Sequence, residues 1–451
     1  MSYPSKAHCR STAAHLPKPS GKAAFYLLGD VHHARHNTDV DLAFRQESNF
    51  IYHSGAEDPG FHLIYDLNEE TLHLFSPVRP EDEVMWMGEG ESLASIQARL
   101  DVDSVKYVTD MASYLDSAAF DTIHVLPTTS LDALGPTHSA KADKTHLADA
   151  TTEARVIKDE KEISLLRYAN KISSDAHIAL MRAAKRATNE RELDALFRYE
   201  TAKVGGRFQA YLPIVGSGTN ASILHYGQND ADMTSLKPGQ LVLVDAGAEF
   251  HGYAADITRT WPIGGKFVGE SRIVYEIALA MQKAVLAELR PGVEWEDMHR
   301  LAFSVCLDGL ISAGIVKQSA SKEDAMANHI PAIFFPHGLG HLIGLDVHDV
   351  GGYPKNVKPI DEPGLRYLRM RRTLKAGMVV TVEPGCYFVR HFIEPALKNP
   401  KQAAFLNADV LASFMDVGGV RLEDCVVITD SGYDNLTTVP KEVKEVEALM
   451  A

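Results

Sequence analysis

Cysteines, basic runs and long apolar runs are all scarce in this chain of 451 residues. The four cysteines, Cys9, Cys306, Cys386 and Cys425, form no C-x-x-C pair. This spacing argues against a disulfide scaffold and against a zinc site built from thiolates. We therefore expect four reduced thiols, as in a cytosol-like compartment.

The charge balance is acidic, with a formal net charge of −15. Nucleic acid and anionic membrane surfaces are therefore poor partners, and a small substrate in solution is the better expectation. No apolar run approaches the length of about 20 residues that crosses a membrane. The first twenty residues contain prolines and charges and lack the apolar core of a signal peptide. These features predict a cytoplasmic protein.

The chain is too long for one compact core and predicts two domains. We expect a flexible tail over residues 1–20, an α/β domain over 21–150 and a second domain over 155–451. Residues 130–155 are small and polar and contain Gly-Pro, which indicates a connection between domains. Strand-like runs in the first domain are residues 24–31, 41–55, 61–67 and 71–77, and residues 88–105 are helix-like.

Four acidic residues in the second domain lie on valine- and glycine-rich segments. Asp245 ends the apolar run LVLVD, and Asp256 lies in a second strand-like run after a turn-prone segment, residues 250–253. This pattern predicts a hairpin that brings two carboxylates together. Glu383 and Glu423 also lie in β-rich runs, so each would project from a rigid sheet.

Converging carboxylates predict a bound cation. Without one, the four acids would repel one another and raise each other's pKa. A single acidic residue in a hairpin is more often a turn or surface residue, but Asp245 ends a strand that is expected to be buried, where an unpaired charge is costly. Oxygen ligands combined with imidazole favour Mn²⁺, with Co²⁺ or Zn²⁺ as possible substitutes.

Residues 334–349, FFPHGLGHLIGLDVHD, supply three imidazoles, those of His337, His341 and His348. A dinucleotide-binding loop would need glycine at position 343, where isoleucine stands. A zincin would need glutamate at position 338, where glycine stands. The glycines are better explained by a close approach of backbone and substrate to the metal.

These motifs resemble the metallopeptidases of the pita-bread fold, among them Xaa-Pro dipeptidase (prolidase) and aminopeptidase P. The resemblance rests on five segments: LHYG (224–227), VDAGAEFHGYAADITRT (244–260), HGLGHLIGLDVHD (337–349), TVEPG (381–385) and GGVRLED (418–424). Residues 35–55 also resemble the N-terminal domain of eukaryotic-type prolidases. The resemblance implies an N-terminal α/β domain followed by a catalytic domain of the pita-bread fold.

The resemblance also implies a site with two metal ions, two Mn²⁺ per subunit. Asp245 and Asp256 would bind the first ion, His341 and Glu383 the second, and Glu423 both, with Asp256 also bridging. Two such ions would lower the pKa of a water molecule and polarise the scissile carbonyl group. Glu383 is the expected proton carrier between that water and the leaving nitrogen.

Five further residues are expected to serve the substrate. His225 would contact it near the scissile bond, His348 would stabilise the oxyanion, and Tyr211 would lie near the pocket. Arg421 lies two residues before Glu423 on a predicted strand, so its side chain would pair with a metal-bound carboxylate or with substrate. Arg369 falls where prolidases bind the free carboxylate of a dipeptide.

The predicted activity is Mn²⁺-dependent hydrolysis of Xaa-Pro dipeptides. The alternative is an Xaa-Pro aminopeptidase that accepts longer proline-containing peptides with the same metal ligands. A binding protein without activity is a third interpretation, disfavoured because every ligand is present. The resemblance also implies a homodimer.

Overall fold

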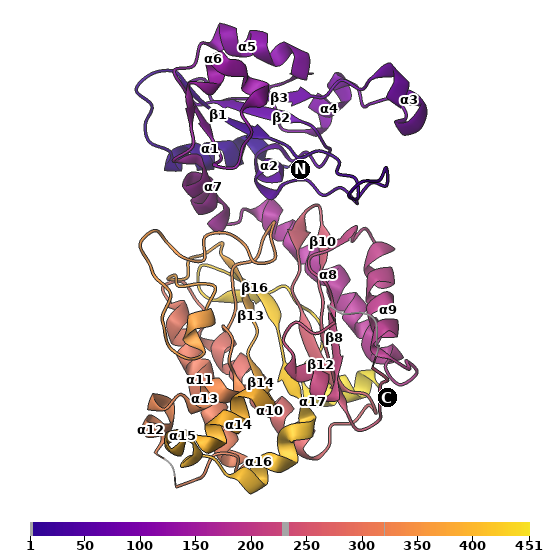
Figure 1. Cartoon of the computed structure of the whole chain (residues 1–451), viewed down its shortest axis with the longest axis vertical. Helices are drawn as coiled ribbons and strands as arrows, with labels where there is room; N and C mark the ends of the chain where they lie inside the picture. Colours follow the sequence, from indigo (N-terminus) through magenta and orange to yellow (C-terminus); the bar gives the residue numbers. More distant parts are fainter. Residues whose placement is uncertain (1–2, 228–233, 320) are drawn as a thin grey trace. The chain divides into compact units, whose positions relative to one another are not determined.

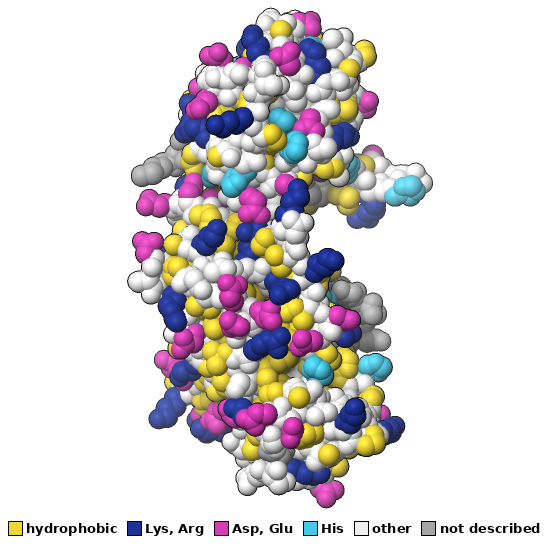
Figure 2. Space-filling model, turned by 90° about the vertical axis from the view of Figure 1, so that its left-hand side faces the viewer, with side chains coloured by type: hydrophobic (Ala, Val, Ile, Leu, Met, Phe, Trp, Pro, Cys, Tyr) yellow, Lys and Arg dark blue, Asp and Glu magenta, His cyan; other side chains and the backbone are white. Residues whose placement is uncertain are grey.

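The computed structural model describes residues 3–227, 234–319 and 321–451, which form two compact units (Figure 1). The first unit ends at Val156 and the second begins at Ile157. Within the described residues, no helix is long and apolar enough to span a membrane. Figure 2 shows acidic and basic side chains mixed over one face of the described chain, without an extended basic area there.

A mixed sheet of six strands forms the centre of the first unit, in the order β4-β3-β2-β1-β5-β6. Strand β2 runs antiparallel to β1 and β3, whereas the pairs β1–β5, β3–β4 and β5–β6 are parallel. The strands are β1 (Ala23–Leu28), β2 (His62–Asp66), β3 (Thr71–Ser76), β4 (Ser104–Tyr107), β5 (Thr122–Val125) and β6 (Ala142–Asp143).

Helices cover both faces of this sheet, as Figure 1 shows. Because side chains alternate along a strand, β1 contributes Phe25 and Leu27 to one core and Ala24 and Tyr26 to the other. Residues of α1, α2, α4 and α7 pack in the first core, and residues of α5 in the second. The helices are α1 (Ser5–His15), α2 (Ser48–Ser54), α3 (Glu81–Met87), α4 (Leu93–Arg99), α5 (Met111–Ala118), α6 (Gly135–Ser139) and α7 (Leu147–Val156).

The expectation of a flexible tail over residues 1–20 is wrong for residues 5–15, which form α1. This helix contains few large apolar residues, but its small side chains allow close packing, and Cys9 is fully buried. His8 of this helix has a hydrogen-bond partner: its Nδ1 atom lies 2.7 Å from the carbonyl oxygen of Tyr52. Hydrogen bonding of this kind allows a polar helix to be buried.

Two further predictions for the first unit are corrected. Within the expected strand over residues 41–55, residues 48–54 form α2. The Glu47 side chain accepts a hydrogen bond from the Phe50 N–H and so caps the helix, which ends at Gly55 in the left-handed conformation. The expected connection over residues 130–155 instead contributes α6, β6 and α7 to the first unit, and Leu147 anchors it in the core.

Short antiparallel sheets form the centre of the second unit. They have the orders β11-β10-β7, β12-β9-β8, β13-β16-β17 and β14-β15. The strands are β7 (Phe208–Gln209), β8 (Ile214–Ser217), β9 (Leu241–Asp245), β10 (Ala248–Phe250), β11 (Tyr253–Ala254), β12 (Thr258–Pro262), β13 (Val379–Val382), β14 (Gly385–Tyr387), β15 (Gly419–Arg421), β16 (Asp424–Ile428) and β17 (Tyr433–Asn435).

Two long helix pairs, α8/α9 and α10/α11, accompany these sheets. Helix α8 begins with a capping box in which Asp159 and Glu162 each accept the other's backbone N–H. The helices are α8 (Glu160–Ala183), α9 (Glu190–Ala202), α10 (Gly269–Glu288), α11 (Trp295–Ser312), α12 (Lys322–Ala327), α13 (Ile330–Phe334), α14 (Arg390–Lys398), α15 (Pro400–Ala403), α16 (Ala408–Phe414) and α17 (Val443–Leu449).

The predicted hairpin around the two aspartates is present. Strand β9 pairs with β12 so that Asp245 faces Thr258, and β10 pairs with β11 across the turn. The hairpin bends between these pairs, where Gly247 lies so close to the Ala255 carbonyl that a Cβ atom would be 1.8 Å from its oxygen. Glycine is therefore required there, and Asp256 lies in the bend.

Candidate active site

All ten residues expected to bind metal or substrate line a single cavity of about 610 Å³ in the second unit. They are Tyr211, His225, Asp245, Asp256, His341, His348, Arg369, Glu383, Arg421 and Glu423. They come from loops and strand ends that are up to about two hundred residues apart in the chain. The fold therefore brings together the whole set that the sequence motifs singled out, while the role of each residue stays a prediction.

The candidate ligands fall into two groups that share one residue. Ligand atoms of Asp245, Asp256 and Glu423 lie within 4.8 Å of one another, and so do those of His341, Glu383 and Glu423. This arrangement has the form expected for two neighbouring cations with Glu423 between them. A third group of the same kind joins Asp256 and His341 to His348.

Asp245 ends strand β9, whereas Asp256, Glu383 and Glu423 lie in short breaks between paired strands. Thr258, opposite Asp245 in the hairpin, donates its hydroxyl hydrogen to the Glu423 carboxylate at 2.7 Å. An isolated bridge between Thr258 and Glu423 also joins the backbones of the two halves of the site. Ligands that are flanked by paired strands in this way have little freedom to move.

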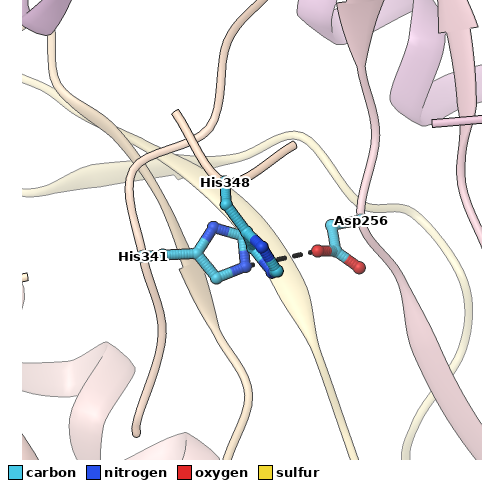
Figure 3. Close-up of side chains that lie close together, drawn as sticks. All are labelled: Asp256, His341 and His348. Atoms are coloured by element: carbon cyan, nitrogen blue, oxygen red, sulfur yellow. Dashed lines mark ion pairs between the residues drawn. The ribbon is translucent and has the colours of Figure 1, made fainter. Parts of the chain in front are cut away.

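His341 points its Nε2 atom toward Asp256 (Figure 3). This atom lies 3.3 Å from Asp256 and 3.5 Å from Glu383, while Nδ1 lies 3.0 Å from the Leu342 carbonyl oxygen. If Nδ1 carries the hydrogen and donates it to that carbonyl, Nε2 is left with a lone pair. Burial lowers the pKa of His341, which favours the neutral, ligating form.

The carboxylates of this cluster are buried close together, so their negative charges repel one another unless positive charge lies beside them. Burial, followed by the charge of Glu423, raises the pKa of Glu383 to about 8. Burial and neighbouring carboxylates also raise the pKa of Asp256 and of Glu423 well above the usual range. Divalent cations would relieve this repulsion, and the donor set of four carboxylates and one imidazole suits them. The residues present therefore fit the metal that the motifs predicted.

Tyr211 and Arg421 contact the aspartates directly. The Tyr211 hydroxyl is hydrogen-bonded to Asp245, and it donates to Asp256 Oδ1 at 2.6 Å. Since a hydroxyl has one hydrogen, Tyr211 can donate it to only one of the two carboxylates at a time. Arg421 Nη2 lies 2.6 Å from Asp245 Oδ2, so the expected pairing with a carboxylate is present.

The remaining predicted residues, His225, His348 and Arg369, surround the open part of the cavity. The His348 ring centre lies 4.5 Å from that of His341. Burial, followed by the charge of His341, lowers the pKa of His348 to about 3, so this ring is neutral near pH 7. Arg369 is exposed and makes no hydrogen bond or ion pair with the residues that the structure describes.

Sequence reasoning assigned no role to two residues that support this site. The Tyr387 hydroxyl accepts a hydrogen bond from Arg421 Nη1 at 2.8 Å and lies 2.8 Å from His337 Nε2. His337 also lines the cavity, with Nδ1 3.7 Å from Glu383. A signal was available for Tyr387, because it lies four residues after Glu383 and strand alternation places both on one face.

Two protein families match successive parts of the chain. Residues 164–430 match metallopeptidase family M24, and residues 8–125 match the N-terminal domain of aminopeptidase P. The first match contains all ten of the predicted site residues.

The chain also resembles named proteins over nearly its full length. It is 42% identical to a probable Xaa-Pro aminopeptidase of Paracoccidioides brasiliensis, covering 99% of this chain and 97% of the relative. It is also 42% identical to the human Xaa-Pro dipeptidase, covering 94% and 88%.

Solved structures agree. The aminopeptidase PepP of Pseudomonas aeruginosa superposes with a TM-score of 0.83 at 28% identity, covering 99% of this chain and 98% of that one. Aminopeptidase P of E. coli gives 0.81 at 29%, with the same coverage. These matches confirm the predicted order of an α/β domain followed by a pita-bread domain, and the chain belongs to metallopeptidase family M24, whose members use divalent metal.

Proposed function

We propose that this metallopeptidase hydrolyses the bond between an N-terminal residue and proline, with Xaa-Pro dipeptides as its main substrates. The observation that carries this proposal is the single cavity lined by two carboxylate-rich donor groups that share Glu423. Relatives at 42% identity are named for Xaa-Pro cleavage, as a dipeptidase and as an aminopeptidase. Since the relatives are peptidases and every predicted ligand is present, we set aside the interpretation as a binding protein.

A dedicated hydrolase suits this substrate, because proline lacks the amide N–H and has a fixed φ angle. The two ions, when bound, would supply an activated water molecule and polarise the scissile carbonyl group. Asp245, Asp256, His341, Glu383 and Glu423 are the residues that would hold them.

The chain's own residues would manage protons and charge. Glu383 belongs to the acidic cluster, where its carboxyl oxygen would accept a proton and pass it to the departing proline nitrogen. His348, at the open side of the cavity, can donate a hydrogen bond to the carbonyl oxygen as negative charge develops there. His225 would hold the substrate near the scissile bond.

The choice of dipeptides as main substrates depends on Arg369. Its guanidinium group lines the cavity without a partner among the described residues, so it can bind a free carboxylate. In a dipeptide that carboxylate belongs to proline itself, whereas a longer peptide carries an amide there. The alternative aminopeptidase activity would require the cavity to stay open beyond proline.

We therefore expect Arg369→Met to reduce kcat/KM for Gly-Pro by about 10- to 100-fold, the scale of a hydrogen bond between charged groups. The same substitution should leave cleavage of Gly-Pro amide, which has no carboxylate, within about twofold. Steady-state release of glycine from both peptides measures this. Arg366→Met is the matched control, because Arg366 is exposed and already paired with Asp361 at 3.1 Å. An equal loss on both peptides would show that Arg369 does not recognise the carboxylate.

The dipeptidase and aminopeptidase activities are separated by comparing Ala-Pro with Ala-Pro-Ala. Cleavage of the dipeptide alone would support the main proposal, and efficient cleavage of the tripeptide would support the alternative. Both assays are run with Mn²⁺ on metal-stripped protein.

Three finer points belong to this proposal. The bound metal is Mn²⁺, two ions per subunit, because the donors are oxygens and one imidazole. The active form is a homodimer, as the family resemblance implies. The compartment is the cytoplasm, consistent with four cysteines that are all buried and unpaired in the structure.

A further inference from the structure

The two glutamates of the site lie in an interruption of one antiparallel ladder. On one side of the interruption Val382 of β13 faces Asp424 of β16, and on the other Gly385 of β14 faces Arg421 of β15. The register is the same on both sides, so Glu383 falls opposite Glu423. Two metal-binding candidates are thus placed across from each other where regular pairing stops.

At this point the backbone N–H groups of both glutamates turn away from the opposite strand. Glu383 donates its N–H to the Leu339 carbonyl oxygen at 2.8 Å, and Glu423 donates to the Thr258 carbonyl oxygen at 3.0 Å. Each glutamate is therefore tied to a neighbouring segment, and their own N–H groups do not fix the spacing between the two strands.

The side chain of Gln282, from α10, joins the strands beside one backbone bond that crosses the interruption, from the Leu422 N–H to the Pro384 carbonyl oxygen at 3.3 Å. Its Nε2 atom donates to the carbonyl oxygen of Val382 at 3.1 Å and to that of Leu422 at 3.1 Å. These are the residues immediately before Glu383 and Glu423. Gln282 is fully buried, so no water competes for its two hydrogens.

A partly buried lysine, Lys441, fixes the orientation of this amide. Lys441 Nζ donates to Gln282 Oε1 at 2.8 Å, and because ammonium cannot accept a hydrogen bond, the oxygen must face Lys441 and the NH₂ group must face the strands. Lys441 also forms an ion pair with Asp424, the residue after Glu423. Asp424 is paired in turn with Arg259 at 2.7 Å, and both are fully buried.

We propose that Gln282 is a positioning residue that sets the distance between the Glu383 and Glu423 carboxylates, and through it the affinity of the metal site. It is not among the residues that line the cavity, and its side-chain hydrogen bonds go to Val382, Leu422 and Lys441. Its two hydrogen bonds hold the residues next to both glutamates at one separation, and outer partners of this kind tune metal affinity. The expected effect of Gln282 on metal affinity requires only the metal site, whereas its expected effect on turnover also rests on the proposed function.

The test uses the full-length chain with Gln282→Met, which keeps the volume and removes the amide. Titration calorimetry with Mn²⁺ on stripped protein should show at least one ion bound about 10- to 100-fold more weakly. At saturating Mn²⁺, kcat for Gly-Pro should fall by about tenfold or more, with KM within about twofold. A merely structural role would lower Tm and leave both quantities unchanged, and that result would overturn the proposal.

Gln282→Glu tests the oxygen and the NH₂ group of the amide separately. Its carboxylate can still accept from Lys441 but has no hydrogens for the two carbonyl groups, so we expect the same loss of Mn²⁺ affinity as in the methionine variant. It is also the fallback if Gln282→Met does not fold, and wild-type affinity in Gln282→Glu would equally refute the proposal.

Ser217→Ala is the matched control for loss of a buried hydrogen bond. Ser217 Oγ is buried on β8 and donates to Glu190 at 2.7 Å, without contacting either glutamate-bearing strand. It should lower Tm and leave Mn²⁺ affinity unchanged. If Mn²⁺ binding is weakened by Gln282→Met but Gly-Pro is not cleaved even by the wild type, the positioning role stands and the proposed substrate fails.

Discussion

Asp256→Asn is expected to reduce turnover of Gly-Pro by about a thousandfold or more, while leaving the fold intact. The magnitude follows from the loss of one charged group that acts on the reacting atoms in a buried site. Asp256 has ligand atoms in two of the candidate metal groups, next to Asp245 in one and His341 in the other. Asparagine has the same shape but cannot supply the negative charge.

For the same variant we expect lower turnover but no loss of stability. The pKa of Asp256 is raised because its charged form is buried and lies near other carboxylates, so an uncharged amide should leave the Tm of the metal-free protein equal or higher. Tyr211 can still donate its hydroxyl hydrogen to the Asn oxygen. The measurement is Tm by circular dichroism, with and without Mn²⁺, beside kcat.

Asp434→Asn is the matched control, because Asp434 belongs to an exposed pair with Arg167 at 2.7 Å. Such pairs contribute little, so kcat and Tm should stay close to those of the wild type. Wild-type turnover in Asp256→Asn would refute the proposed two-metal site.

Removal of metal is the second change with a large expected effect. Chelation with EDTA should lower kcat for Gly-Pro by at least about a hundredfold, because the ions supply several kcal/mol of stabilisation to the developing charge. Mn²⁺ should restore activity and raise Tm, since a ligand that binds the folded state stabilises it. Full activity after exhaustive chelation, verified by metal analysis, would contradict the proposal.

The metal-free protein should also lose stability as pH rises. Glu383 has a folded-state pKa raised to about 8, so between its unfolded value and about pH 8 the folded state holds more protons than the unfolded state. The stability that protonation provides is fully present below the unfolded pKa and is lost as pH rises through the folded pKa. Urea unfolding of stripped protein from pH 5 to pH 9 measures this. Loading with Mn²⁺ should weaken the dependence, because the cations favour the ionised carboxylates.

The sequence pattern predicted an element correctly where one contiguous segment contains all the residues that define it. The hairpin around Asp245 and Asp256 could be predicted because an apolar run, a turn and a second run follow one another in sequence. The strands β1, β2 and β3 were found in the same way. Pattern failed for α1 and α2, whose residues are polar or mixed and become ordered through capping and burial against other elements.

The residues of the site also divide into those that the sequence predicted and those that it did not. Motif resemblance named ten residues that prove to line one cavity, since each motif is contiguous in sequence. Tyr387 received no role, because its contact with Arg421 joins two strands whose pairing cannot be read from either one alone. Gln282 also received no role, because its contacts with the residues before both glutamates depend on the packing of α10.

By itself, the sequence determined the chemistry: which side chains could bind metal, the family they indicate and the two-domain order, because these depend on residue identity and contiguous spacing. Only the tertiary structure decided the contact of Tyr211 with both aspartates and the network behind the glutamates. The reason is physical: these contacts join residues far apart in the chain, and packing and hydrogen bonding across the fold determine them.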